Sequence, residues 1–223
     1  MSANNILYCL PGLGVDERAF SRLVVPGWTI RVLRWLRPEP GEPLARYARR
    51  MREQIDEERP VVLGLSFGGM IAIEMARQAP LRQVILLSSI RGHAEMPSWM
   101  RLSGRLRLHR IVPLPVMRFF SQFNNGRLGV RTPEEKAFVQ EYRRNADPWY
   151  LNWAIDAIVR WSNEWQPEGL VHIHGSGDRI FPMARLQPTH IIPGGTHLMV
   201  FNQAEEVSRV LGEVLGRDVR RET

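Results

Sequence analysis

One short stretch, P-V-V-L-G-L-S-F-G-G-M at residues 60–70, places the strongest constraint on how this chain can fold. The apolar run Val61–Leu65 predicts a buried parallel strand, and helical periodicity follows almost at once, over Met70–Ala79. A strand that becomes a helix so quickly must turn sharply at Ser66, with glycine on both sides because larger side chains would collide there. Such a turn would present the Ser66 hydroxyl at a helix N-terminus, where oriented amides favour negative charge.

The chain of 223 residues is long enough for one domain with an insertion. Its single cysteine, Cys9, excludes an internal disulfide and suits a reducing compartment. No apolar run is long enough to span a membrane, and the N-terminal residues lack the basic region of a signal peptide, so we expect a cytoplasmic protein. No metal-binding or nucleotide-binding motif occurs, so we expect neither a metal nor a cofactor.

The net charge of +7 is concentrated in one part of the chain. Residues 91–144 contain ten arginines and one lysine against four acidic residues, which is a local balance of +7. This excess favours either an anionic partner or a solvated basic face. Nucleic acid is not expected, because no binding motif or aromatic platform accompanies the charge.

Short apolar runs alternate with helical patterns on both sides of residues 91–166. Such alternation predicts a mainly parallel sheet covered by helices. The predicted strands are Asn5–Leu10, Thr29–Arg34, Val61–Leu65, Gln83–Leu87, Leu170–His174 and Thr189–Ile192. The predicted helices of the same part are Val15–Leu23, Leu44–Glu57, Met70–Ala79 and Leu198–Leu215.

Residues 91–166 contain no convincing strand and hold five of the seven tryptophans. We expect helices over Pro115–Phe123, from Thr132-Pro133 and from Asp147-Pro148, the last two with a capping residue before the proline. We therefore divide the chain into an α/β core of residues 1–90 and 167–223 and a helical cap, or lid, of residues 91–166.

The tryptophans of this segment follow helical spacing: Trp149, Trp153, Trp161 and Trp165 recur in steps of four residues or a multiple of four. Such a stripe is typical of a helix packed onto a neighbouring domain. If some of the rings face Ser66, they would bind an acyl or aromatic group instead. On this second interpretation the tentative substrate-binding residues are Trp99, Trp149 and Trp153.

Ser66 can act as a nucleophile only with a base in hydrogen-bond reach and a third group that orients the base. Asp178 follows the predicted strand Leu170–His174, and His197 lies on a glycine-rich loop after the strand Thr189–Ile192. Because the carboxyl ends of parallel strands meet at one edge of the sheet, we expect these three catalytic candidates to come together there. His93 is an alternative base.

Three other histidines, His172, His174 and His190, lie in or beside predicted strands and are expected to be core or edge residues. A fourth requirement is a pair of backbone N–H groups that stabilise an oxyanion. One should belong to Phe67, the residue after Ser66, and the second to Leu13 in the loop P-G-L-G after the first strand.

With these residues in place, the chain resembles the α/β-hydrolase superfamily, and small bacterial members with a helical cap in particular. The matching segments are L-P-G-L-G (10–14), G-L-S-F-G-G (64–69), H-G-S-G-D-R-I-F-P (174–182) and G-G-T-H (194–197). The resemblance implies that Ser66 is the nucleophile, His197 the general base and then acid, and Asp178 the orienting carboxylate. The first two strands common in the family are missing, so the sheet should have six strands rather than eight.

The resemblance implies a serine esterase or thioesterase that acts on a small acyl substrate, without a cofactor, as a monomer or homodimer. Serine at the turn argues against dehalogenase or epoxide hydrolase activity, because the superfamily members with those activities use aspartate there. Two alternatives stay open: a ligand-binding protein on a hydrolase scaffold, and cofactor-free lyase or perhydrolase chemistry at the same residues.

Overall fold

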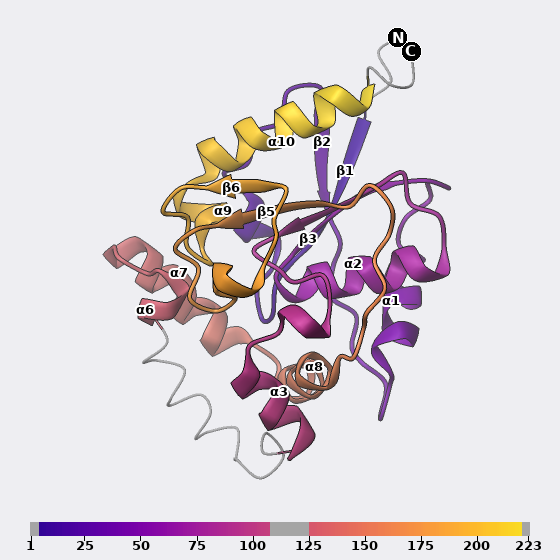
Figure 1. Cartoon of the computed structure of the whole chain (residues 1–223), viewed down its shortest axis with the longest axis vertical. Coiled ribbons are helices and arrows are strands. Elements are labelled where there is room, and N and C mark those ends of the chain that lie inside the picture. The colour runs from indigo at the N-terminus through magenta and orange to yellow at the C-terminus, as the bar shows by residue number, and fades with distance from the viewer. Residues whose placement is uncertain (1–4, 108–124, 220–223) are drawn as a thin grey trace.

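The computed structural model describes residues 5–107 and 125–219, and it contains one sheet of six strands (Figure 1). The strands follow the order β2-β1-β3-β4-β5-β6, and every neighbouring pair is parallel. The prediction of six strands is confirmed. Their bounds are Asn5–Leu10 (β1), Trp28–Val32 (β2), Val61–Leu65 (β3), Gln83–Leu87 (β4), Val171–Gly175 (β5) and His190–Ile192 (β6).

Helices follow every described strand, and those between β4 and β5 form the longest excursion from the sheet. The α-helices are Leu44–Arg52 (α1), Phe67–Gln78 (α2), Ser98–Arg105 (α3), Asn125–Leu128 (α6), Pro133–Asn145 (α7), Pro148–Arg160 (α8), Met199–Asn202 (α9) and Ala204–Val219 (α10). Short 3-10 turns cover Glu17–Phe20 (η1), His93–Glu95 (η2) and Met183–Arg185 (η4). None of the helices in the described part of the chain is both long and apolar enough to cross a membrane.

Side chains alternate between the two faces of the sheet along each strand. Both faces are buried, because helices cover each of them. In β1, Tyr8 and Leu10 join the apolar core beneath α1, α2 and α8, whereas Leu7 and Cys9 join the core beneath η1, α9 and α10. Figure 1 shows this layering, with α10 on one side of the sheet and α1 and α2 on the other. The sheet is therefore a rigid central layer, and its strand ends are suited to hold reactive groups.

Helices α7 and α8, between β4 and β5, begin at the capping residues that the sequence predicts. The Thr132 hydroxyl accepts a hydrogen bond from the Glu135 N–H, and the Glu135 carboxylate accepts one from the Thr132 N–H in return. The Asp147 carboxylate caps α8 by accepting from the Trp149 N–H. The predicted helix over Pro115–Phe123 lies outside the described residues.

Four predicted helices differ from the structure. The predicted helix Leu44–Glu57 ends five residues early, at Arg52 of α1. The segment Val15–Leu23 forms only the 3-10 turn η1, because Asp16 caps a single turn there. Helix α8 ends at Arg160, so Trp161 and Trp165 lie on the returning chain and not on the helix. The terminal helix is interrupted at Gln203, whose non-helical backbone (φ −130°, ψ 36°) separates α9 from α10.

Candidate active site

Ser66 occupies the turn between β3 and α2 with a strained backbone, φ 52° and ψ −115°. Glycine is required on both sides of it. A Cβ on Gly64 would lie 2.4 Å from the Gly69 Cα, and a Cβ on Gly68 would lie 2.3 Å from the Leu10 carbonyl oxygen. The turn is held by hydrogen bonds from the Ser66 N–H to the Leu87 carbonyl and from the Gly69 N–H to the Ser66 carbonyl, both 2.9 Å.

The structure brings Ser66, His197 and Asp178 into one line of hydrogen bonds. Nε2 of His197 lies 3.0 Å from the Ser66 Oγ, and Nδ1 of the same ring lies 2.8 Å from the Asp178 Oδ2. The three residues follow β3, β5 and β6, whose carboxyl ends share one edge of the sheet. His197 is placed by the loop between β6 and α9, which packs closely on the end of β5: a Cβ on Gly175 would lie 2.2 Å from the Gly195 carbonyl oxygen.

The Asp178 carboxylate is buried, with 4% of the residue exposed, and it is fully hydrogen-bonded. Its Oδ1 accepts from the backbone N–H groups of Ile180 (2.7 Å) and Phe181 (3.0 Å). Burial acts to raise the pKa of Asp178, but the charge and hydrogen bond of His197, with the other donors, outweigh it and lower the pKa. Asp178 is therefore an ionised acceptor at neutral pH and favours a proton on Nδ1 of His197.

A second histidine contacts this carboxylate from inside the protein. His174 on β5 is fully buried; its Nε2 lies 2.9 Å from the Phe181 carbonyl oxygen and 3.4 Å from the Asp178 Oδ2. His172, on the same face of β5, lies 3.1 Å from the Ser89 carbonyl oxygen. Burial lowers the pKa of both histidines, to about 3 for His172, so both are neutral. Their prediction as core histidines agrees with this burial.

The two remaining histidines singled out from the sequence, His93 and His190, form hydrogen bonds with residues other than Ser66. His93, the alternative base, forms a hydrogen bond through Nδ1 with the Trp161 carbonyl at the base of the excursion (3.0 Å). His190 is an edge residue whose Nδ1 lies 3.0 Å from the Thr189 hydroxyl. Neither hydrogen bond joins these histidines to Ser66.

The two candidate oxyanion donors adjoin Ser66. Phe67 is the first residue of α2, so its N–H has no acceptor within the helix. The loop after β1 approaches from the other side: a Cβ on Gly12 would lie 3.4 Å from the Ser66 Cβ. Gly14, with φ 71°, turns the chain just after Leu13. The loop that carries Leu13 is thus next to the serine, as the motif requires.

The tryptophans of α8 are tied to the core by their indole N–H groups. Trp149 donates to the Pro38 carbonyl (3.1 Å) and Trp153 to the Glu42 carbonyl (2.8 Å). Trp161, just beyond α8, donates to the buried Glu74 carboxylate on α2 (2.8 Å). These contacts fit the packing interpretation of the stripe. Substrate contact by Trp149 and Trp153 stays a prediction, and Trp99 lies with 56% of its surface exposed.

Two residues that contact the serine turn, Trp35 and Ser89, were not predicted from the sequence. Trp35 stacks on Phe67 with ring centroids 5.9 Å apart, and its indole N–H donates to the Val15 carbonyl (3.0 Å). Ser89 donates its hydroxyl proton to the Ser66 carbonyl (2.7 Å). Trp35 gave no sequence signal, but Ser89 lies just after the strand that pairs with β3, so strand order could have indicated it.

Helix α7 is held to the loop after β1 by a polar cluster. The Tyr142 hydroxyl donates to the Asp16 carboxylate (2.8 Å), and Arg18 pairs with both Asp16 and Glu141. Burial raises the pKa of Tyr142, and its hydrogen bond to Asp16 adds to the effect. These contacts join the segment that holds Leu13 to the helices between β4 and β5.

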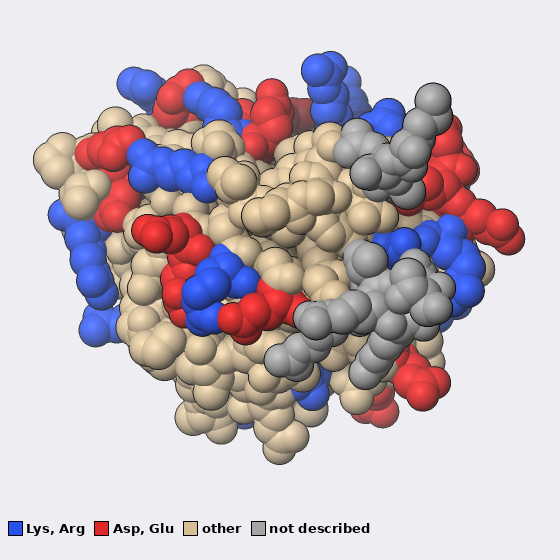
Figure 2. All heavy atoms as spheres, turned by 90° about the horizontal axis from the view of Figure 1, so that it is seen from above, with Lys and Arg blue, Asp and Glu red and all other residues tan. Residues whose placement is uncertain are grey.

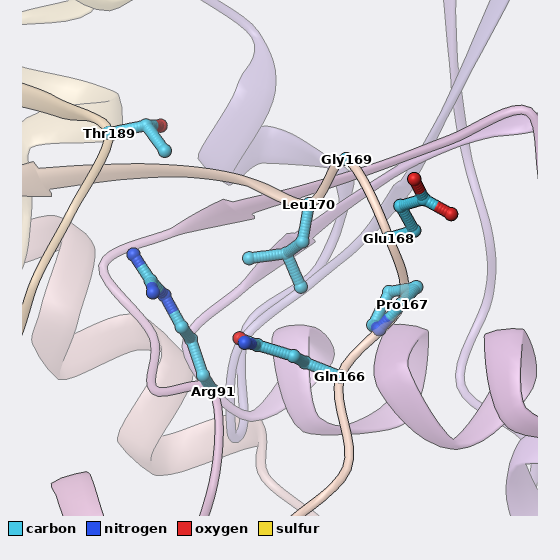
Figure 3. A pocket seen from close by; sticks show the side chains of 7 residues that line it. All are labelled: Arg91, Gln166, Pro167, Glu168, Gly169, Leu170 and Thr189. Carbon is cyan, nitrogen blue, oxygen red and sulfur yellow. The ribbon is translucent and has the colours of Figure 1, made fainter.

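A surface cavity of about 350 Å³ lies apart from Ser66 (Figure 3). Leu170 and Thr189, which line it, directly precede β5 and β6, so it opens at the ends of the strands opposite to those that precede Asp178 and His197. Arg91 and Gln166 point toward its centre in Figure 3, but the Arg91 guanidinium already donates to the Gln187 carbonyl. Within the described residues, no group of His, Cys, Asp and Glu side chains could hold a metal ion.

The comparisons with known proteins agree on one architecture. A family model described as "Alpha/beta hydrolase family" matches residues 2–210. No curated protein matches the chain significantly. A thermophilic esterase from Thermogutta terrifontis, solved with malate bound, is 20% identical with a TM-score of 0.74, over 97% of this chain and 91% of that one.

Two further solved structures have similar folds. A bromoperoxidase from Bacillus anthracis is 15% identical with a TM-score of 0.69, over 96% of this chain and 93% of that one. An epoxide hydrolase from Bacillus megaterium is 12% identical with a TM-score of 0.68, over 96% and 94%. At such identities the likeness shows a shared fold, and the differing chemistries of these neighbours leave the reaction to be argued from the site itself.

Proposed function

Because the chain belongs to the alpha/beta hydrolase family, we propose that it is a serine hydrolase that cleaves an ester or thioester bond of a small acyl substrate. The observation that carries the proposal is the line of hydrogen bonds from Ser66 through His197 to Asp178. A buried carboxylate, an imidazole and a serine hydroxyl in this order are the parts needed for nucleophilic acyl transfer.

In the proposed first step the Ser66 Oγ attacks the substrate carbonyl carbon while its proton passes to Nε2 of His197. This direction requires Nε2 to be unprotonated and Nδ1 to carry the proton, which is the tautomer that the Asp178 carboxylate favours at 2.8 Å. The imidazolium that forms is stabilised by the same carboxylate. It then donates its proton to the departing alcohol or thiol, which leaves an acyl ester on Ser66.

The tetrahedral intermediate carries a negative charge on the former carbonyl oxygen. The backbone N–H groups of Phe67 and Leu13 would bind it, and the N-terminus of α2 adds its dipole. Each such donor commonly contributes about 3 kcal/mol to the transition state. In the second step His197 removes a proton from water, which hydrolyses the acyl-enzyme and restores the serine.

Residues 91–166 would act as a cap over this site. Contacts of α7 with Asp16 and Arg18, and of α8 with Pro38 and Glu42, support this role, because they hold both helices against loops of the core. The substrate would enter between these helices and the carboxyl ends of the strands. This region would select the length of the acyl chain and the leaving group that the site accepts.

The test is the initial rate of hydrolysis on activated esters and on coenzyme A thioesters of matched acyl chain length. Ser66→Ala and His197→Ala should each reduce the rate by about three orders of magnitude or more, whereas Ser21→Ala, at an exposed serine of the same domain, should not. A fluorophosphonate probe should label Ser66, as read by mass spectrometry of the labelled peptide. Unchanged rates in both variants would contradict the proposal, and saturable binding of the acyl compounds without turnover would favour the binding protein.

A further inference from the structure

One face of α3 presents large apolar side chains to solvent. Trp99, Leu102 and Leu106 are 56%, 53% and 54% exposed, although spacings of three and four residues place them together on one side of the helix. They make up three of the seven large hydrophobic side chains that are exposed among the described residues. We refer to these three side chains as the α3 ridge.

The packing of α3 fixes which side faces outward. Gly104 lies against α8 so closely that a Cβ on it would be 1.9 Å from the Val159 carbonyl oxygen. Since Gly104 is on the opposite side of α3 from Trp99, this contact directs the ridge away from the protein. Figure 1 shows α3 beside α8 at the end of the molecule farthest from α10.

The ridge is bordered by positive charge. Arg105 and Arg107 are exposed beside Leu106, and Arg101 lies one turn earlier. None of the three forms an ion pair with a carboxylate within the described part of the chain. The sequence has no acidic residue between Glu95 and Glu134. By contrast, the face above α10 shows acidic and basic side chains interspersed (Figure 2).

We propose that the α3 ridge docks the protein on an anionic lipid surface. Charge complementarity selects this occupant, because arginines attract anionic headgroups while Trp and Leu side chains enter the interface between headgroups and acyl chains. A protein partner fits less well, since a specific protein interface buries about 800 Å² per partner and the ridge consists of three side chains on two helical turns. The lipid surface needs no matching shape.

The proposal does not depend on catalysis by Ser66, so it is tested by binding. Full-length protein is sedimented with vesicles of phosphatidylcholine alone and of phosphatidylcholine with phosphatidylglycerol, at low and high salt. We expect binding to the anionic vesicles, and weaker binding at high salt. Ser66→Ala should bind like the unchanged protein, which separates this result from the proposed activity.

Two double variants, each with a control, test whether the α3 ridge is the part of the protein that binds the vesicles. Leu102→Ser with Leu106→Ser should lower the partition coefficient about tenfold or more, whereas Val24→Ser with Ile191→Ser, at residues exposed by 70% and 52% elsewhere, should not. Arg105→Gln with Arg107→Gln should lower it by about an order of magnitude, whereas the control Arg34→Gln with Arg37→Gln should not.

Circular dichroism of each variant checks that it is folded. Equal binding to neutral and anionic vesicles, or ridge variants that bind like the unchanged protein, would overturn the proposal. Absence of binding together with a dimer that dissociates in Leu102→Ser with Leu106→Ser would assign the ridge to a second copy of the chain instead.

Discussion

The Nε2 atom of His174 lies 3.4 Å from the Asp178 Oδ2, the same oxygen that Nδ1 of His197 contacts at 2.8 Å. His174 also meets the Phe181 carbonyl at 2.9 Å, while the Phe181 N–H donates to the other carboxylate oxygen. A neutral, buried imidazole thus holds both the carboxylate and the turn that carries it. We expect His174 to position the Asp178 carboxylate so that it accepts the hydrogen bond from Nδ1 of His197.

Replacing His174 tests this relationship. His174→Leu removes the donor to the Phe181 carbonyl, leaves that oxygen unpaired in the core and loosens the turn at Asp178, so kcat should fall about tenfold or more with little change in KM. His174→Gln keeps an N–H donor and should restore much of the rate. His172→Leu is the matched control, because it loses a similar bond, to the Ser89 carbonyl, outside this turn. Equal loss of kcat in both Leu variants would contradict the positioning role.

Glycine at the serine turn is a steric requirement, whereas Gly212 in helix α10 is not. Gly68→Ala would place a Cβ 2.3 Å from the Leu10 carbonyl oxygen, so we expect loss of folded protein or of activity. Gly212→Ala meets nothing within 4 Å in the interior of α10 and should stabilise the protein by about 0.5–1 kcal/mol. Thermal unfolding of both variants is the measurement, and a stable, active Gly68→Ala protein would contradict the argument.

The indole hydrogen bonds of α8 predict an anchoring role for its tryptophans. Trp153→Phe keeps the aromatic contact with Tyr47 but loses the bond to the Glu42 carbonyl, so the free energy of unfolding should fall by about 1 kcal/mol. Trp149→Phe should cost less, because Trp149 is 44% exposed and water can replace its partner. Chemical denaturation measures both. Unchanged stability with a raised KM in Trp153→Phe would instead favour its role in substrate binding.

Stability should decrease on acidification because of the two buried histidines. Burial, with the neighbouring His174 and Arg91, lowers the pKa of His172 to about 3, and burial lowers that of His174 as well. The unfolded chain therefore binds protons more readily, and stability falls as the pH decreases from about 6.5 toward 3. Asp178, whose pKa is lowered, acts in the same direction below about pH 4.

Denaturation at several pH values measures this effect. His172→Gln keeps an N–H donor for the Ser89 carbonyl but does not titrate, so its stability should depend less steeply on pH, by about one proton. His190→Gln, which replaces a histidine on the sheet edge instead, is measured alongside for comparison. A slope unaffected by His172→Gln would contradict the assignment.

Local patterns determined much of the fold. The strand, serine turn and helix at residues 61–78, the six strands, and the caps at Thr132 and Asp147 were predictable, because each depends on neighbouring residues. The alternation of strands and helices, which implies a parallel sheet, also allowed the prediction that Ser66, Asp178 and His197 follow strands which end at one edge. The length of α8 was predicted wrongly, because the tryptophan stripe continues past Arg160, where the helix ends. The break at Gln203 in the terminal helix was not predicted, because the apolar pattern runs through it.

Only the tertiary structure decided which contacts these elements make. The bonds of Trp153 to Glu42, of Trp161 to Glu74 and of Tyr142 to Asp16 join residues 87 to 126 positions apart, and no local pattern encodes such partners. The exposed ridge on α3 likewise follows from the close approach of Gly104 to Val159. The sequence determines which faces of a strand or helix are apolar, whereas packing of all the elements together determines what each face meets.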